Sequence, residues 1–143
     1  AKGVAPAFAF GHGLSYSSFA YSGLSVTPLK AEPAETTGSD LATPAVSVRF
    51  TITNTSPVPG REVPQLYLSF PPEAAEPPLG LKAFTKTTAL EPQASVEVEF
   101  VLRKRDVSIW SSDGHFWEVL PGEYRVSIGA SSEDLRLRAQ LTL

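Results

Sequence analysis

The sequence predicts an all-β protein, an antiparallel β-sandwich of about seven strands. Apolar residues alternate with polar ones at period two in several separate segments. Thirteen prolines and ten glycines fall largely between these segments, where turns are expected. A helical period extends over no more than residues 103–109. Short strands joined by turns are typical of two packed antiparallel sheets.

Four strands carry the clearest alternation. In residues 46–52, Val46, Val48, Phe50 and Ile52 share one face, and serine, arginine and threonine occupy the other. Residues 96–102, 124–128 and 135–141 repeat this pattern, with glutamate or arginine at most of the intervening positions. Each of these segments is therefore expected to be a half-buried strand.

Three further strands are predicted at residues 24–26, 66–70 and 81–86. Residues 57–60 (PVPG) and 121–122 (PG) are expected to form turns. Residues 103–109 can form one or two helical turns, and Asp106 is expected to cap them.

A tyrosine at the start of a strand favours particular kinds of β-sandwich. In residues 120–124 (LPGEY), Tyr124 follows a turn, as in a tyrosine corner, where the hydroxyl reaches back to the main chain. Immunoglobulin-like and fibronectin type III-like sandwiches both use this corner. A plain core tyrosine is the alternative.

The length of 143 residues suits one domain. We expect residues 1–21 to form an amino-terminal tether, with Phe10, Tyr16 and Phe19 packing on the sandwich or on a neighbouring domain. Residues 22–143 are expected to form the sandwich. Residues 28–44 have no aromatic side chain and are expected to form a long mobile loop in which nothing packs.

Composition excludes several classes of function. The formal charge is −3 and basic residues are scattered, so a nucleic-acid partner is not expected. There is no cysteine, and no apolar run reaches the roughly 18 residues of a membrane span. Residues 1–9 have no signal-peptide pattern and no initiator methionine, which suggests a piece of a longer precursor.

No pattern predicts a catalytic, cofactor or metal site. His12 and His115 are the only histidines, and neither is spaced with carboxylates as metal ligands are. Gly11 and Gly13 flank His12 but are not followed by the helix that a phosphate site requires. Glu97 and Glu99 share the solvent face of one strand, where nothing would separate their pKa values into an acid and a base.

Aromatic rings are the remaining candidates for a ligand site. Flat exposed rings stack on sugars and on phenolic polymers. Tyr67 is expected to face away from the core of Leu66 and Leu68, and a connection between strands holds Trp110, Phe116 and Trp117. The alternative is that these rings cover one end of the sandwich or pack on a neighbouring domain.

One modification site is predicted. Asn54-Thr55-Ser56 matches the N-glycosylation sequon and lies at a strand end. Surface exposure of Asn54 in a secreted protein would permit a glycan there.

The order of motifs resembles the carboxy-terminal domain of family 3 glycoside hydrolases, especially fungal β-glucosidases. The motifs are residues 10–19 (FGHGLSYSSF), 53–56 (TNTS) with Gly60, 63–68 (VPQLYL), 81–84 (LKAF), 105–110 (RDVSIW), 121–124 (PGEY) and 129–132 (GASS). The resemblance implies a fibronectin type III-like domain after two domains that carry the nucleophilic aspartate and the acid/base glutamate. Neither catalytic motif matches this chain.

Two roles follow from the resemblance. As a non-catalytic accessory domain of a secreted β-glucosidase, the chain would pack on the catalytic domains of the same polypeptide, stabilise them and shape the substrate entrance. As a binding module, it would hold polysaccharide or lignin through exposed aromatics. Glycoside hydrolysis by this chain alone is not expected.

Overall fold

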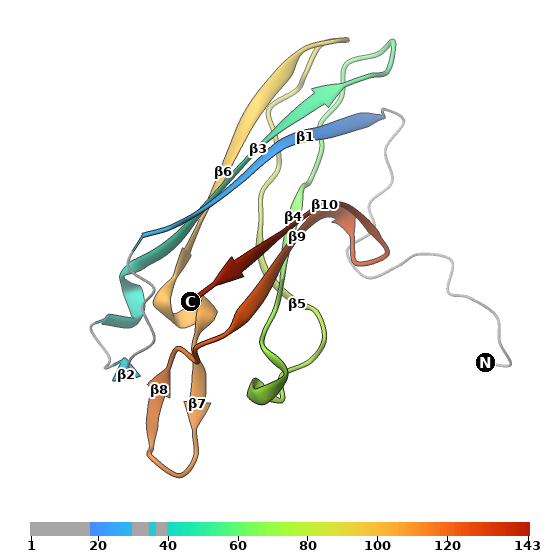
Figure 1. Ribbon diagram of the computed structural model, residues 1–143. Helices are drawn as coiled ribbons and strands as arrows, with labels where there is room; N and C mark the ends of the chain where they lie inside the picture. The colour runs from blue at the N-terminus through green and yellow to red at the C-terminus, as the bar shows by residue number, and fades with distance from the viewer. Residues whose placement is uncertain (1–17, 30–34, 37–39) are drawn as a thin grey trace, which may run out of the picture.

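The two main sheets form the predicted sandwich. The computed structural model describes residues 18–29, 35–36 and 40–143. The first sheet has the order β1-β3-β6, and the second has the order β10-β9-β4-β5, with antiparallel neighbours throughout. Figure 1 shows the two sheets as separate layers. The strands are β1 (Phe19–Pro28), β3 (Pro44–Asn54), β4 (Gln65–Ser69), β5 (Gly80–Phe84), β6 (Ser95–Arg103), β9 (Glu123–Ser131) and β10 (Asp134–Thr142).

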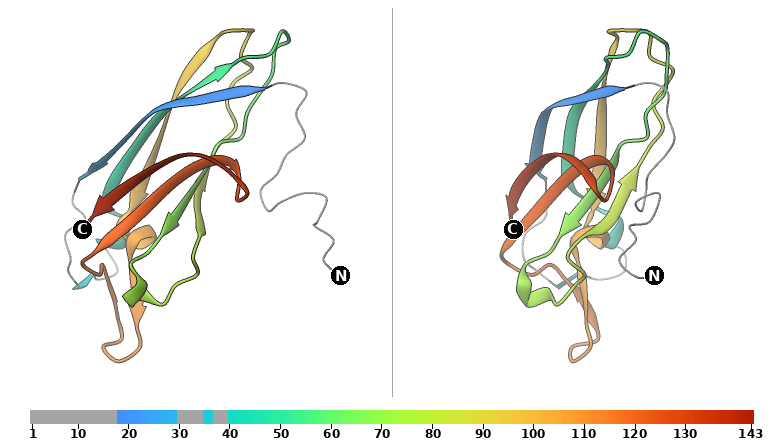
Figure 2. Two further views of the ribbon diagram at one scale, coloured as in Figure 1. Left: turned by 45° about the vertical axis from the view of Figure 1, so that its right-hand side comes forward. Right: turned by 90° about the vertical axis from the view of Figure 1, so that its right-hand side faces the viewer.

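These seven strands correspond to the seven that the sequence predicts. A third, small sheet has the order β2-β8-β7 and contains β2 (Glu35–Thr36), β7 (Ile109–Ser111) and β8 (Phe116–Glu118). The β7–β8 hairpin projects from one end of the sandwich in both views of Figure 2. Strands of two or three residues are too short to display a period, which is why the sequence did not reveal them.

The helical content is limited to short 3₁₀ segments. They are η1 (Asp40–Ala42), η2 (Pro72–Ala74) and η3 (Lys104–Val107). Asp106 caps η3 as predicted, since its Oδ2 accepts a hydrogen bond of 2.8 Å from the Arg103 N–H. In the described part of the chain, no helix has the length and apolar character needed to cross a bilayer.

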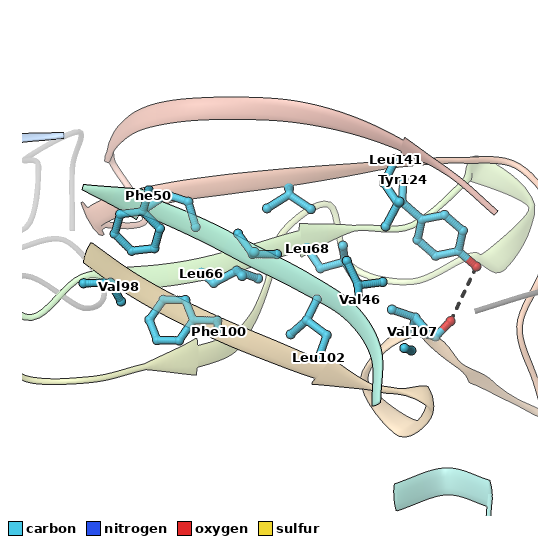
Figure 3. Close-up of a cluster of buried hydrophobic side chains, with 14 of the residues drawn as sticks. Val46, Phe50, Leu66, Leu68, Val98, Phe100, Leu102, Val107, Tyr124 and Leu141 are labelled. Carbon is cyan, nitrogen blue, oxygen red and sulfur yellow. Dashed lines mark hydrogen bonds between the residues drawn. The ribbon is translucent and has the colours of Figure 1, made fainter. Parts of the chain in front are cut away.

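The core lies between the two sheets. The inward residues of β3 and β6 meet those of β4 and β9, as the close-up in Figure 3 shows. Val46, Phe50, Leu66 and Leu68 are at most 1% exposed. Burying a side chain of this size contributes about 1.5–3 kcal/mol, so the alternating positions supply most of the driving force for folding.

Tyr124 forms the hydrogen bond of a tyrosine corner. Its ring is fully buried, and its hydroxyl donates to the Leu120 carbonyl at 2.8 Å, with the Val107 carbonyl at 3.5 Å (Figure 3). Burial raises the pKa of Tyr124 to about 12, although the Leu120 contact lowers it slightly. The corner thereby ties β9 to the turn that precedes it and to the end of η3.

The amino-terminal part departs in two details from the expectation. Phe19 and Tyr21 belong to β1 and pair with Asn54 and Ile52 of β3, so the sandwich begins before residue 22. Phe19 is buried in the core, which is one of the two positions predicted for it. Within residues 28–44, Leu41 in η1 is only 9% exposed, so the expectation that nothing in this segment packs is wrong. η3 contacts η1 and can cover the Leu41 side chain. Phe10 and Tyr16 lie outside the described residues.

Candidate functional site

An aromatic cleft opens at the end of the sandwich where the β7–β8 hairpin projects. Its volume is about 370 Å³. The hairpin, η3 and the segment from the end of β4 through β5 each contribute part of the wall. The lining residues are Phe70, Glu76, Lys82, Arg105, Asp106, Ser108, Ile109, Trp110 and Trp117.

Two tryptophans form the hairpin wall. Trp110 on β7 pairs in register with Trp117 on β8, and their ring centroids are 5.7 Å apart at an interplanar angle of 68°. Trp110 is 48% exposed, whereas Trp117 is half-buried. An edge-to-face pair of this kind holds both rings in fixed orientations. Trp110 therefore presents a large apolar surface to the cleft and to solvent.

The hairpin turn also fixes Phe116. This ring is half-buried and packs over Gly114, where an added Cβ would lie 2.0 Å from the ring. Phe116 does not line the cleft with the two tryptophans. The structure thus brings Trp110 and Trp117 together and gives Phe116 a position in the turn of the same hairpin.

Phe70 connects the cleft to the core. Its ring centroid lies 5.4 Å from that of Tyr124, and the Lys82 Nζ lies 5.3 Å above the Phe70 ring. A cation over a ring face is attracted by the ring quadrupole. The cleft wall is consequently supported by the same tyrosine that anchors the corner.

The cleft combines apolar rings with hydrogen-bonding groups. Glu76, Lys82 and Arg105 line it, while the Asp106 carboxylate accepts from the Arg103 main chain. Flat rings beside a few polar side chains suit a sugar ring or an aromatic unit of a polymer. Among the described residues, no three metal-ligating side chains gather at one place.

The sequence pattern did not reveal the polar lining of the cleft. Phe70 was expected only as a strand residue, and Lys82 was assigned to another strand. These residues come from different elements, so their proximity is set by the packing of the β4–β5 segment beside the hairpin. The Trp110 to Trp117 spacing was the one local signal for the site.

Tyr67 is not part of an exposed surface, and the expectation of an exposed ring there is wrong. It lies on β4 opposite Ser127 of β9 and is only 1% exposed. Its hydroxyl donates to the Gln65 Oε1 at 2.5 Å, and burial raises the pKa of Tyr67. The side chain does point away from the core cluster, as predicted, but a buried ring has no free face for a polymer.

Asn54 is also buried, which contradicts the predicted glycosylation site. The residue is 0% exposed, and its Nδ2 donates to the Val58 and Leu90 carbonyls, each at 2.8 Å. Its Oδ1 accepts from the Ser56 N–H at 2.9 Å and from the Ser56 Oγ at 2.7 Å. A glycan would replace one of the Nδ2 hydrogens and has no space at this position.

Comparison with known proteins assigns the family. The model of the fibronectin type III-like domain matches residues 62–132. This chain carries a fibronectin type III-like domain. The matched residues extend from just before β4 to the end of β9 and include Tyr124 of the tyrosine corner.

Relatives of the fibronectin type III-like chain are β-glucosidases. Probable β-glucosidase D of Aspergillus niger is 39% identical over 150 residues, which cover 100% of this chain and 20% of the relative. Probable β-glucosidase L of Emericella nidulans is 41% identical, with coverage of 99% and 20%. The resemblance inferred from the motif order is confirmed.

Solved structures agree with this relationship. The β-D-glucoside glucohydrolase of Trichoderma reesei superposes with a TM-score of 0.91 at 38% identity, over 97% of this chain and 20% of that chain. β-Glucosidase 3B of Thermotoga neapolitana, in complex with glucose, gives 0.79 at 37% identity, over 99% and 18%. The chain thus spans about a fifth of the length of these proteins.

Proposed function

We propose that this fibronectin type III-like chain is a non-catalytic accessory domain of a larger secreted β-glucosidase. The parent enzyme hydrolyses terminal β-D-glucosyl residues of cello-oligosaccharides with retention, through a double displacement that requires two carboxylates. Alignment of nearly the whole chain with about a fifth of each β-glucosidase supports this proposal. The catalytic carboxylates lie in the remaining four-fifths, and the domain stabilises that part and borders the substrate entrance.

The experiment is removal of residues 18–143 from the full-length parent enzyme. A stabilising role predicts a lower thermal midpoint or a lower yield of secreted enzyme. A contribution to the entrance predicts a higher KM for cello-oligosaccharides with kcat largely retained, because only substrate binding is altered. An unchanged midpoint, yield and KM would refute the accessory role.

The aromatic cleft supports a second candidate, a module that binds polysaccharide or lignin. Trp110 has 48% of its surface exposed, beside Trp117 and the Phe70 ring, and Lys82 and Arg105 can hydrogen-bond to hydroxyl groups. A ring lost from such a site removes about 0.5–1.5 kcal/mol of stacking, beyond the buried area.

Depletion from solution by insoluble cellulose, xylan or lignin tests this second candidate. Trp110→Ala is expected to weaken a saturable depletion several-fold. Phe84→Ala is the matched control, because Phe84 is 68% exposed on a different sheet edge. An equal reduction of depletion in both variants would indicate nonspecific adsorption. If no polymer depletes the protein, the accessory role is the only proposal that remains.

A further inference from the structure

The two outer faces of the sandwich have opposite character. On the outer face of β3 and β6, the Ser47 Oγ donates to the Glu99 carboxylate at 2.8 Å, and Thr53 and Ser95 share a hydrogen bond of 2.7 Å. Val101 is the exposed large apolar residue of β6, at 44%. A sheet face with this polar pattern is suited to water.

The outer face of β4 and β5 is apolar by contrast. Phe84 is 68% exposed, and Leu81 and Val63 are each 36% exposed. Leu81 pairs with the buried Tyr67, and the Thr85 N–H donates to the Pro64 carbonyl at 3.3 Å, which places Val63 beside the end of β5. We call Val63, Leu81 and Phe84 the Phe84 patch.

The Phe84 patch also lies on a sheet edge. β5 is the terminal strand of its sheet, with β4 as its one hydrogen-bonded neighbour among the described strands. Proteins usually protect such an edge by charge, by a bulge or by a covering element. Here the edge carries a phenylalanine with two-thirds of its surface exposed, which is typical of a surface that another protein segment covers.

Arg136 fixes the beginning of β1 on the sandwich. Arg136 on β10 donates to the Phe19 carbonyl, and its guanidinium pairs with Asp134 at 2.9 Å and lies 4.8 Å from the Tyr21 ring centroid. These contacts hold the beginning of β1 against the beginning of β10 (Figure 1).

Strand register places Phe84 and Leu135, the neighbour of Arg136, in one row of the second sheet. Phe84 pairs with Gln65 on β4, Gln65 pairs with Gly129 on β9, and Gly129 pairs with Leu135 on β10, next to Arg136. This row runs across the whole sheet, with β10 at one edge and Phe84 on β5 at the other, so the beginning of β1 and the Phe84 patch lie at the same end of the sandwich.

Two arginines border the same face. Arg138 pairs with Ser127, Arg125 lies two residues away on β9, and both are exposed. The ion pairs between described residues are Arg49–Glu99 and Arg136–Asp134, so neither arginine has a carboxylate partner in the described part of the chain. A partner with acidic groups opposite Arg125 and Arg138 would complement this charge.

We propose that the Phe84 patch is the surface on which the catalytic part of the parent enzyme packs. This proposal rests on the accessory role proposed above. The partner is a folded protein surface with an apolar centre and acidic groups facing the two arginines. About four-fifths of the length of the related β-glucosidases lies outside this chain, which is ample for an interdomain interface of roughly 600–1,500 Å².

The test compares Phe84→Ser with Val101→Ser in the full-length parent enzyme. Both replace an exposed apolar residue on an edge strand, but on opposite faces. We expect Phe84→Ser to lower the thermal midpoint by about 3–5 °C and Val101→Ser by no more than about 1 °C. Hydrogen exchange of the β5 amides is expected to be at least about tenfold slower in the full-length enzyme than in the 143-residue chain.

Equal midpoints for the two variants, together with equal β5 exchange in the full-length enzyme and the 143-residue chain, would overturn the assignment of this face. The accessory role would survive that result if removal of residues 18–143 still lowered the midpoint. If removal itself has no effect, the accessory role and the docking surface both fail.

Discussion

Replacing Asn54 by alanine tests the inference that this residue is a buried structural element of the sandwich and not a glycosylation site. Asn54 ends β3, and its side-chain amide joins Ser56, Val58 and Leu90 through four hydrogen bonds of 2.7–2.9 Å. The residue is completely buried, so water cannot replace these bonds. We expect Asn54→Ala to destabilise the sandwich at the end where β3 leads toward β4.

The magnitude follows from the groups left behind. Without Asn54, the single hydroxyl hydrogen of Ser56 can turn to the Val58 carbonyl, which lies 2.9 Å from its Oγ. The Leu90 carbonyl keeps a bond from the Gly60 N–H at 3.0 Å. The buried Ser56 N–H loses its acceptor, at a cost of about 1–3 kcal/mol, and each bond lost at a carbonyl costs about 0.5–1.5 kcal/mol. The expected loss in the free energy of unfolding is about 3 kcal/mol, or roughly 10 °C in midpoint.

Urea denaturation followed by tryptophan fluorescence measures this loss. Thr53→Ala is the matched control, because its neighbouring hydroxyl makes an exposed bond to Ser95 and should contribute less than about 0.5 kcal/mol. A loss below about 1 kcal/mol for Asn54→Ala, or one equal to that of Thr53→Ala, would refute the reasoning.

Three further outcomes are expected. Tyr124→Phe should lose about 1 kcal/mol in urea denaturation; because the pKa of Tyr124 is raised to about 12, the wild type should also lose more stability than the variant above about pH 10. The Ser47 hydroxyl and Arg49 hold the pKa of Glu99 below its usual range, so this stabilisation is present above about pH 4.3 and disappears as the pH falls further. Glu99→Gln should therefore reduce the drop in midpoint between pH 6 and about pH 3. Gly129→Ala should cost more than about 2 kcal/mol, because its Cβ would lie 2.0 Å from a backbone oxygen.

Each of these outcomes has a result that contradicts it. Identical alkaline stability curves for the wild type and Tyr124→Phe would contradict the raised pKa of the hydroxyl. An unchanged acid-side drop in Glu99→Gln would show that the surface contact contributes nothing, as many exposed ion pairs do. For Gly129, the control is Gly80→Ala, whose Cβ would have 3.8 Å to its neighbours, and equal losses would refute the steric argument.

The order of strands along the chain could be predicted well from the sequence. Whether residues on the outer faces of the sheets are exposed or covered could not. Period two identified β3, β6, β9 and β10, because each has one face in the core and one outside it. The same period correctly placed Tyr67 away from the core cluster. It carried no information about whether that outer position is covered, and Tyr67 is buried.

The candidate site was likewise only partly predictable from the sequence. The sequence placed Trp110 and Trp117 on one connection, and the register of β7 and β8 makes them partners. Phe70 and Lys82 reach the cleft from another part of the chain, which spacing alone cannot show. The sequon is a related case, because the three-residue pattern indicates what an enzyme can recognise and is silent about burial of Asn54.

By itself the sequence determined the sandwich, its tyrosine corner and its kinship with β-glucosidases, since these depend on local alternation and on motif order. Tertiary structure alone decided that Asn54 is enclosed, that Tyr67 is covered and that Phe84 is exposed. The physical reason is that a strand pattern specifies which side of a sheet a residue occupies. What lies against that side is set by segments distant in sequence, such as Leu90 beside Asn54.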